Sequence, residues 1–319
     1  MNEAIISNSG KLALKQFPRP KLQNGSVIIR QEFFGLNYDD IKAVKGRIKN
    51  PNLHNILGVE ASGVVEEVSA DCKKEFKVGD RVCYATYNPG AFIKFRSVSE
   101  NYLVPMPKYL STEGGATLLK GLLAYTILGK VFVISAPVFI ILSGASGGVG
   151  SIITQIASKA NFKIIALTSK DAKKDYIKSN GAFEVINYKT ENVAERVKEI
   201  TKGVGADYFF DCLGSDADAF ALESLKLRGF LIQFGTITGE SSKINLHTQK
   251  EKSITTTRVS IGNYITNYND FLSASFAYMK SIQAGVIVPK ITIYPFSEMN
   301  KAFSEMQNGS GVGQKVLQI

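Results

Sequence analysis

The chain has 319 residues, enough for two domains, and its 45% apolar and 21% charged residues exclude a disordered or collagen-like protein. Its 38 basic and 28 acidic side chains give a net charge of +10. The lysines are scattered, which favours a solvated surface over a nucleic-acid-binding stripe. Three widely spaced cysteines form no CxxC pair, and the N-terminus lacks a basic start followed by an apolar run. These features predict a reduced, cytoplasmic protein.

Residues 1–115 show short strand patterns separated by glycine turns. The patterns lie at Ser26–Glu32, Gly63–Val68 and Arg81–Ala85. Such short strands with frequent turns predict an irregular antiparallel β-barrel.

Residues 122–143 form a long apolar stretch with a single charge, nominally enough to cross a bilayer. Gly129-Lys130 and Pro137 interrupt it, and its last part is a β-branched run that leads into a glycine turn. We therefore expect a buried helix end followed by a buried strand, and no membrane span.

From Val138 onward, short apolar runs alternate with helical patterns. Strands are predicted at Val138–Ser143, Lys163–Leu167, Glu184–Asn187, Asp207–Asp211 and Phe230–Phe234. Helices are predicted over Val149–Ala160 and at Ala172–Ser179, Glu191–Thr201 and Asp216–Leu227. Repeated strand–helix–strand units with short connections predict a doubly wound parallel sheet.

After about Arg258 this alternation weakens. A helix near Tyr268–Ala284 and a strand at Ile291–Tyr294 are suited to rejoin the first part of the chain. The expected organisation is one domain formed by residues 1–116 and 262–319, with a second domain, residues 117–261, inserted into it.

The sharpest motif is the turn SGASGGVG at residues 143–150, which fits the pattern A-x-G-x-x-G between a strand and an amphipathic helix. Small residues let the backbone approach a pyrophosphate, which then rests on the N–H groups of the helix N-terminus. A tight structural turn is the alternative, but the strand–turn–helix context favours dinucleotide binding. The candidate cofactor-binding residues are Ala145, Ser146, Gly147, Gly148, Val149 and Gly150.

The residues that follow Lys163–Leu167, the second predicted strand of the inserted domain, indicate whether the cofactor is NAD or NADP. An NAD site usually has an acidic residue there, whereas this chain reads Thr168-Ser169-Lys170, with Lys173 and Lys174 close behind. Hydroxyl and ammonium groups suit a 2′-phosphate and favour NADPH. The alternative is an ordinary lysine-rich helix face capped by Asp171.

Five segments resemble the quinone oxidoreductase (zeta-crystallin-like) branch of the medium-chain dehydrogenase/reductase superfamily. They are Gly35–Asp40, Leu57–Gly63, Lys77–Val82, Gly144–Gly150 and Gly181–Tyr188. The resemblance implies a GroES-like catalytic domain, an inserted Rossmann domain and NADPH in the cleft between them. It also implies a homodimer, often formed by joining Rossmann sheets edge to edge.

The same resemblance assigns roles to single residues. Similar reductases hold the 2′-phosphate at positions that match Ser169, Lys173 and Tyr188. Asn37 matches a residue near the nicotinamide, and Gly235 matches a backbone contact after the fifth Rossmann strand.

Zinc-containing members of the superfamily have a cysteine in the turn that matches Asn37–Asp40 and a histidine in the segment that matches Gly58–Glu60. Neither is present here. We therefore expect a metal-free reductase.

The expected reaction is direct hydride transfer from NADPH to a quinone or another conjugated carbonyl, with catalysis by positioning and hydrogen bonding. Asn37 is expected to orient the nicotinamide carboxamide or to donate to the substrate. Lys42 would stabilise negative charge if it points inward, and Asp40 is expected to fix the loop by hydrogen bonds.

Two alternatives remain open from the sequence. The first is a double-bond reductase that acts on an enoyl thioester or a 2-alkenal, with which the aliphatic Ile48 and Leu123 are compatible. The second is a nucleotide-sensing or RNA-binding protein that does not turn over a substrate. Phosphate-driven RNA binding would weaken steeply with salt.

Overall fold

The computed structural model describes residues 2–8, 10–48, 54–131 and 138–319. Their contacts divide the chain into two compact units. The first unit comprises residues 1–122 and 265–319, and the second comprises residues 123–264.

A seven-stranded sheet forms most of the first unit. In spatial order its strands are β14 (Ile291–Pro295), β15 (Gln314–Gln318), β3 (Ser26–Gly35), β4 (Glu60–Val68), β5 (Arg81–Ala85) and β7 (Leu103–Pro105), and β6 (Phe95–Ser99) also pairs with β3. All pairings except β14 with β15 are antiparallel. The hairpin β1 (Asn2–Asn8) and β2 (Lys11–Phe17) forms a separate two-stranded sheet. The predicted antiparallel β-domain is confirmed.

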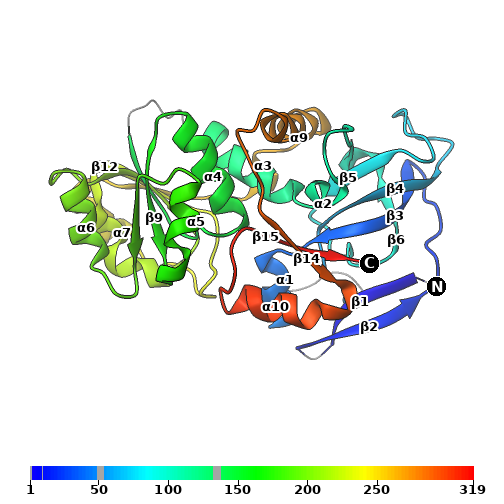
Figure 1. The fold of residues 1–319 in the computed structure, drawn as a ribbon, viewed down its shortest axis with the longest axis horizontal. Coiled ribbons are helices and arrows are strands. Elements are labelled where there is room, and N and C mark those ends of the chain that lie inside the picture. Colours follow the sequence, from blue (N-terminus) through cyan, green and yellow to red (C-terminus); the bar gives the residue numbers. More distant parts are fainter. Residues whose placement is uncertain (1, 9, 49–53, 132–137) are drawn as a thin grey trace. The chain divides into compact units, whose positions relative to one another are not determined.

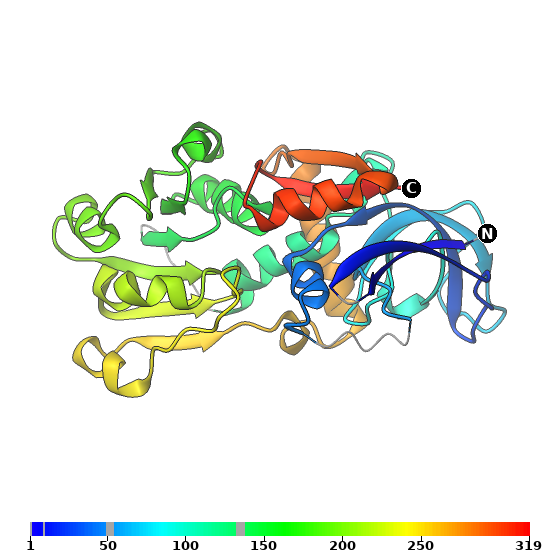
Figure 2. The ribbon, with the colours of Figure 1, turned by 90° about the horizontal axis from the view of Figure 1, so that it is seen from below.

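The C-terminal segment completes this sheet. Strand β15 pairs antiparallel with β3, with Val316 opposite Gly35, and residues from both ends of the chain belong to one hydrophobic core. Figure 2 marks both chain ends within this unit. Helices α9 (Tyr268–Gln283) and α10 (Met299–Gln307) belong to the same unit, as do the short helices α1 (Tyr38–Val44) and α2 (Thr112–Gly115).

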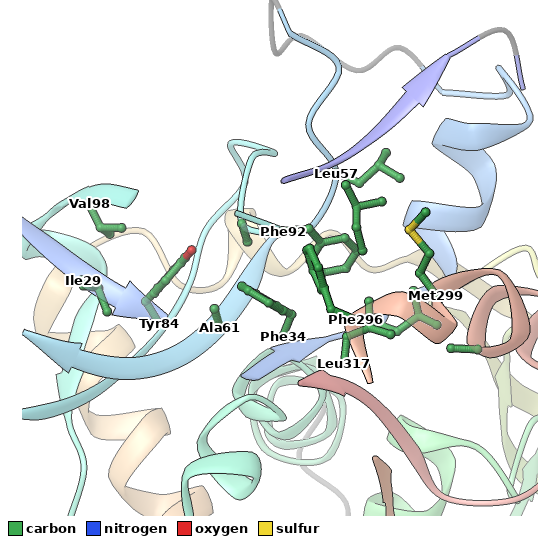
Figure 3. Packing of buried hydrophobic residues seen from close by; sticks show 14 of the residues in the cluster. Ile29, Phe34, Leu57, Ala61, Tyr84, Phe92, Val98, Phe296, Met299 and Leu317 are labelled. Atoms are coloured by element: carbon green, nitrogen blue, oxygen red, sulfur yellow. The ribbon is translucent and has the colours of Figure 1, made fainter. Parts of the chain in front are cut away.

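Aromatic and aliphatic side chains from distant segments form the core of the first unit (Figure 3). The ring centroid of Phe34 lies 5.7 Å from that of Phe92 and 5.4 Å from that of Phe296. Met299 and Leu317 join them from the C-terminal segment. Burial of these apolar side chains, at about 25 cal/mol per Å², is what holds the two ends of the chain together.

The second unit contains a parallel six-stranded sheet with helices on both faces (Figure 1). In order, its strands are β10 (Glu184–Asn187), β9 (Lys163–Thr168), β8 (Phe139–Leu142), β11 (Ala206–Asp211), β12 (Leu225–Gln233) and β13 (Thr255–Arg258). Its helices are α4 (Gly148–Lys159), α5 (Lys174–Ser179), α6 (Val193–Ile200), α7 (Asp218–Ser224) and α8 (Leu246–Gln249). This order is that of a doubly wound sheet, as predicted.

The predicted helix Asp216–Leu227 is wrong at its C-terminal end. Helix α7 ends at Ser224, and β12 begins at Leu225. Lys252 explains the early end, because its Nζ donates to the carbonyl oxygens of Leu222, Glu223 and Leu225 at 3.0, 2.8 and 2.7 Å. A cation at a helix C-terminus is favourable, since it satisfies carbonyls that have no partner within the helix.

The apolar stretch at residues 122–143 begins in helix α3 (Leu118–Thr126), continues as a π-helical turn over Ile127–Val131 and ends in β8. Pro137 lies outside the described residues. None of the described helices has both the length and the apolar character of a membrane span.

Candidate functional site

The glycine turn joins β8 to α4 in the second unit. Gly147 is the N-cap of α4, its N–H donates to the Gly144 carbonyl at 2.9 Å, and its own carbonyl accepts from the Ser151 N–H at 3.0 Å. The first N–H groups of an α-helix have no acceptor within the helix. This helix start therefore offers backbone donors and the positive end of its dipole to an anion.

Two glycines of the turn are required by close packing. A Cβ on Gly150 would lie 2.2 Å from the Gly144 oxygen and 2.7 Å from the Ala145 Cα. Gly144 has a φ of +66°, and a Cβ there would lie 2.5 Å from the Cys212 Sγ. The turn therefore has the tight backbone that a pyrophosphate-binding loop needs.

Asp211, at the end of β11, holds this turn against the next loop. Its carboxylate accepts from the Ser143 hydroxyl at 2.9 Å and from the backbone N–H groups of Leu213 and Gly214 at 2.8 and 3.0 Å. Burial raises the pKa of Asp211, although these hydrogen bonds oppose the shift. Sequence analysis missed this residue, although an acidic residue that ends an apolar strand was a usable signal.

Gly235 and the glycine turn both lie beside Cys212. Gly235 follows β12, and a Cβ there would lie 3.1 Å from the Cys212 Cβ. Within the turn, Ala145, Ser146 and Gly150 are buried, whereas Gly147, Gly148 and Val149 are partly exposed. The partly exposed residues are those that a ligand can reach.

Ser169 and Tyr188 lie side by side because each follows a strand of the β9–β10 pair. Asn187 is opposite Thr168, and the Tyr188 N–H donates to the Thr168 carbonyl at 3.0 Å. Burial raises the pKa of Tyr188, and a hydrogen bond with the Ser169 side chain opposes that shift. The sheet register thus brings together two of the three predicted 2′-phosphate residues.

Two neighbouring lysines, Lys173 and Lys174, follow β9. The Lys174 Nζ lies 2.9 Å from the Asp171 carboxylate and 3.2 Å from the Glu191 carboxylate. Lys173 is partly buried at the end of a 3-10 turn over Asp171–Lys173. Lys174 is thus held by two carboxylates, and Lys173 is the lysine that is predicted to contact the 2′-phosphate.

In the first unit, Asn37 and Asp40 are joined through the start of α1. Asn37 is the N-cap, its N–H donates to Asp40 Oδ2 at 2.8 Å, and the Asp40 N–H donates to the Asn37 carbonyl at 3.1 Å. The bond from the Asn37 N–H to the Asp40 carboxylate is one half of a capping box. The Gly58 N–H donates to Asp40 Oδ1 at 3.0 Å, so Asp40 ties two loops together, as predicted for its structural role.

Burial raises the pKa of Asp40 to about 7, against the opposing effects of its hydrogen bonds to Asn37 and Gly58 and of the nearby Lys120 ammonium. The side chain is 4% exposed. Desolvation dominates because a buried carboxylate loses its water, and two backbone donors replace that water only in part.

The Asn37 side chain is fixed by two acceptors. Its Nδ2 donates to the Gly35 carbonyl at 3.1 Å and to Glu60 Oε1 at 2.8 Å. Glu60 Oε1 also accepts from the Lys120 Nζ, and Glu60 Oε2 accepts from the Leu119 N–H at 2.7 Å. Sequence analysis missed Glu60 and Lys120 because an ion pair between residues 60 positions apart leaves no local pattern.

Lys42 does not join this group. Its Nζ lies 3.0 Å from the Asp39 carboxylate, and only 14% of its side chain is exposed. The ammonium charge is therefore shared with a neighbouring carboxylate on the same helix.

The donors around Asn37 do not fit a zinc ion. Structural zinc takes about four nitrogen or sulfur ligands, and a catalytic zinc takes three protein ligands. Across residues 2–8, 10–48, 54–131 and 138–319, no group of three or more His, Cys, Asp or Glu side chains is placed to hold a metal. Both Glu60 oxygens already accept hydrogen bonds, and the Lys120 ammonium beside them would repel a cation.

Two family models match the chain. The alcohol dehydrogenase GroES-like domain matches residues 23–108, and the zinc-binding dehydrogenase model matches residues 148–275. Among solved structures, a quinone oxidoreductase of Pseudomonas syringae pv. tomato DC3000 has a TM-score of 0.95 at 31% identity, with all of both chains covered. The Escherichia coli quinone oxidoreductase complexed with NADPH also has a TM-score of 0.95, at 29% identity and with all of both chains covered.

Curated relatives agree with these matches. Over 296 residues, 91% of this chain and 90% of the relative, the sequence is 31% identical to Quinone oxidoreductase 1 of Escherichia coli K12. It is also 28% identical to a 2-haloacrylate reductase of a Burkholderia species, over 92% of this chain and 90% of that one. The chain therefore belongs to the quinone oxidoreductase branch of the medium-chain dehydrogenase/reductase superfamily.

Proposed function

We propose that this protein transfers a hydride from NADPH to a quinone or another conjugated carbonyl compound. The observation that carries this proposal is the glycine turn between β8 and α4, whose packing excludes a Cβ at Gly150. The E. coli relative, similar to this chain along its whole length, is described as complexed with NADPH.

Bound NADPH supplies the hydride, and the chain's own residues bind and orient it. The α4 N-terminus holds the pyrophosphate, while Ser169, Lys173 and Tyr188 hold the 2′-phosphate. Gly235 lets the backbone after β12 approach the cofactor. Asn37 accepts a hydrogen bond from the nicotinamide carboxamide; it is not a donor to substrate, because both its amide hydrogens are already used.

A substrate panel tests the reaction. We expect the purified protein to consume NADPH with 1,4-benzoquinone, as followed by the loss of NADPH absorbance. Calorimetry on ligand-stripped protein should detect NADPH binding even without a substrate. If neither NADPH nor NADH bound, the proposed function would be wrong.

A second candidate substrate class is a conjugated double bond, favoured by the similarity to the 2-haloacrylate reductase. Comparing rates with 1,4-benzoquinone, a 2-alkenal and crotonyl-CoA separates the two classes. Faster turnover of the alkenal or the thioester than of the quinone would favour double-bond reduction.

The substitution Lys173→Glu is expected to weaken NADPH binding by about 10- to 100-fold and to leave NADH binding nearly unchanged. A charge-assisted hydrogen bond is worth about 1.5–3 kcal/mol, and NADH has no 2′-phosphate to lose. Dissociation constants from calorimetry measure both effects.

Lys202→Glu is the matched control, because it makes the same charge change at an exposed position of the second unit. It should leave both affinities near those of the wild type. Equal losses for NADPH and NADH in the Lys173→Glu protein would contradict the assignment of the 2′-phosphate site.

We further propose that the protein is a cytoplasmic homodimer. Strands β10 and β13 are the edges of the six-stranded sheet, and the family resemblance implies a dimer that joins such sheets edge to edge. Cys72, Cys83 and Cys212 form no disulfide, which fits a reducing compartment. Sedimentation equilibrium is expected to give twice the chain mass of 34.8 kDa. Cell fractionation tests the compartment.

A further inference from the structure

A buried ion pair lies directly behind Asn37. Glu60 is fully buried, Lys120 is 4% exposed, and Glu60 Oε1 accepts from both the Lys120 Nζ and the Asn37 Nδ2. Glu60 Oε2 faces the first turn of α3, where it accepts from the Leu119 N–H at 2.7 Å. Every oxygen of this carboxylate thus has a named donor.

Room for the carboxylate is provided by a glycine. A Cβ on Gly35 would lie 2.3 Å from Glu60 Oε1 and 2.1 Å from the Ala116 carbonyl oxygen. The Gly35 carbonyl is also the other acceptor for the Asn37 amide, at 3.1 Å. Gly35, Glu60 and Lys120 therefore all help to fix the side chain of Asn37.

The orientation of the Asn37 amide follows from these acceptors. An amide nitrogen has two hydrogens, and here one points to a carbonyl and the other to a carboxylate, neither of which can donate. Turning the amide over would place its oxygen against two acceptors. Only Oδ1 is left for a ligand, and it can only accept a hydrogen bond.

We propose that the Glu60–Lys120 ion pair is a positioning pair, which fixes Asn37 so that its Oδ1 receives the carboxamide NH₂ of the nicotinamide. This inference rests on the proposed function and adds two residues to it. Buried ion pairs contribute little net stability compared with apolar replacements, so stability alone gives this pair little reason to be charged. A second role, orienting the amide, accounts for it.

The test compares NADP⁺ with its 3-acetylpyridine analogue, in which a methyl group replaces the carboxamide NH₂. Calorimetry gives the ratio of the two dissociation constants for each variant. The Asn37→Ala protein sets the ratio expected without the hydrogen bond. We expect the dissociation constant of the analogue divided by that of NADP⁺ to be about five- to tenfold larger in the wild type than in Asn37→Ala. This is the effect of one hydrogen bond.

Two changes at the pair should give opposite results. In E60Q the Lys120 ammonium still attracts an oxygen to the same place, so the ratio should stay within about twofold of the wild type. In E60M/K120M the pair is replaced by apolar side chains without leaving a buried charge, and the ratio should fall to that of Asn37→Ala. Glu298→Gln, in an exposed pair with Lys301, is the control for a Glu→Gln change.

The outcomes separate the two proposals. If the wild type bound neither NADP⁺ nor NADPH, the proposed function would fail. If both nucleotides bound but E60M/K120M kept the wild-type ratio, the positioning role would be overturned.

Should E60M/K120M not fold, E60Q/K120M is the second variant, because without an ammonium the amide introduced at position 60 can turn its NH₂ toward Asn37. Its ratio should then lie below that of E60Q, and an equal ratio would overturn the inference.

Discussion

Gly150→Ala is expected to abolish tight NADPH binding and to destabilise the second unit. The added Cβ would overlap the Gly144 oxygen at 2.2 Å and the Ala145 Cα at 2.7 Å, and both are backbone atoms that cannot rotate away. Moving the turn costs about 1–3 kcal/mol. Losing two charge-assisted hydrogen bonds to the pyrophosphate costs about 3 kcal/mol or more, which weakens binding roughly 100-fold. Thermal unfolding and calorimetry measure the two effects.

Gly147→Ala tests whether a side chain in the turn can block the pyrophosphate without destabilising the turn itself. The nearest atom to its Cβ would be the Gly144 oxygen at 3.3 Å, and the φ of −88° suits any residue. We expect this variant to lower the melting temperature much less than Gly150→Ala does, yet to bind NADPH more weakly, because the methyl group meets the pyrophosphate. Gly129→Ala, where an added Cβ would meet no atom of the described residues within 4 Å, is the control that should change neither property. If Gly150→Ala bound NADPH like the wild type, the turn would not be the cofactor site.

Most of the second unit follows from local pattern in the sequence. The predicted strand Glu184–Asn187 is identical to β10, and Lys163–Leu167 differs from β9 by one residue. Parallel strands covered on both faces are continuous apolar runs, which are easily recognised. The end of α7 was predicted wrongly because its cap, Lys252, lies 28 residues beyond Ser224 and leaves no local signal.

The site was predictable where function depends on backbone shape, and less so where it depends on distant side chains. The glycine turn carries its own sequence signature, and the register of β9 and β10 then places Ser169 beside Tyr188. Glu60 and Lys120 have no such signature. Only the folded β4 and α3 bring that carboxylate and ammonium together, so sequence reasoning singled out Asn37 without the pair that holds it.

Asp40→Asn is expected to remove a pH dependence of stability between about pH 4 and pH 7. The pKa of Asp40 rises from 3.8 to about 7 on folding, because burial disfavours the charged form. Between these values the folded protein holds a proton that the unfolded chain has released. Stability therefore falls as pH rises through this window, by about 1.4 kcal/mol per pH unit, and levels off above about pH 7.

Urea unfolding of the wild type and of Asp40→Asn at pH 5, 6, 7 and 8 measures this difference. The asparagine keeps one oxygen acceptor but sets an NH₂ against the N–H of either Asn37 or Gly58, a cost of about 1–3 kcal/mol that does not vary with pH. The slope of the difference, rather than its value at one pH, therefore reports the ionisation of Asp40. A difference that is flat, or that grows in favour of the wild type as pH rises, would contradict a raised pKa. The expected slope would mean that the protein gives up stability near neutral pH to keep a charged acceptor for the two loops that hold Asn37.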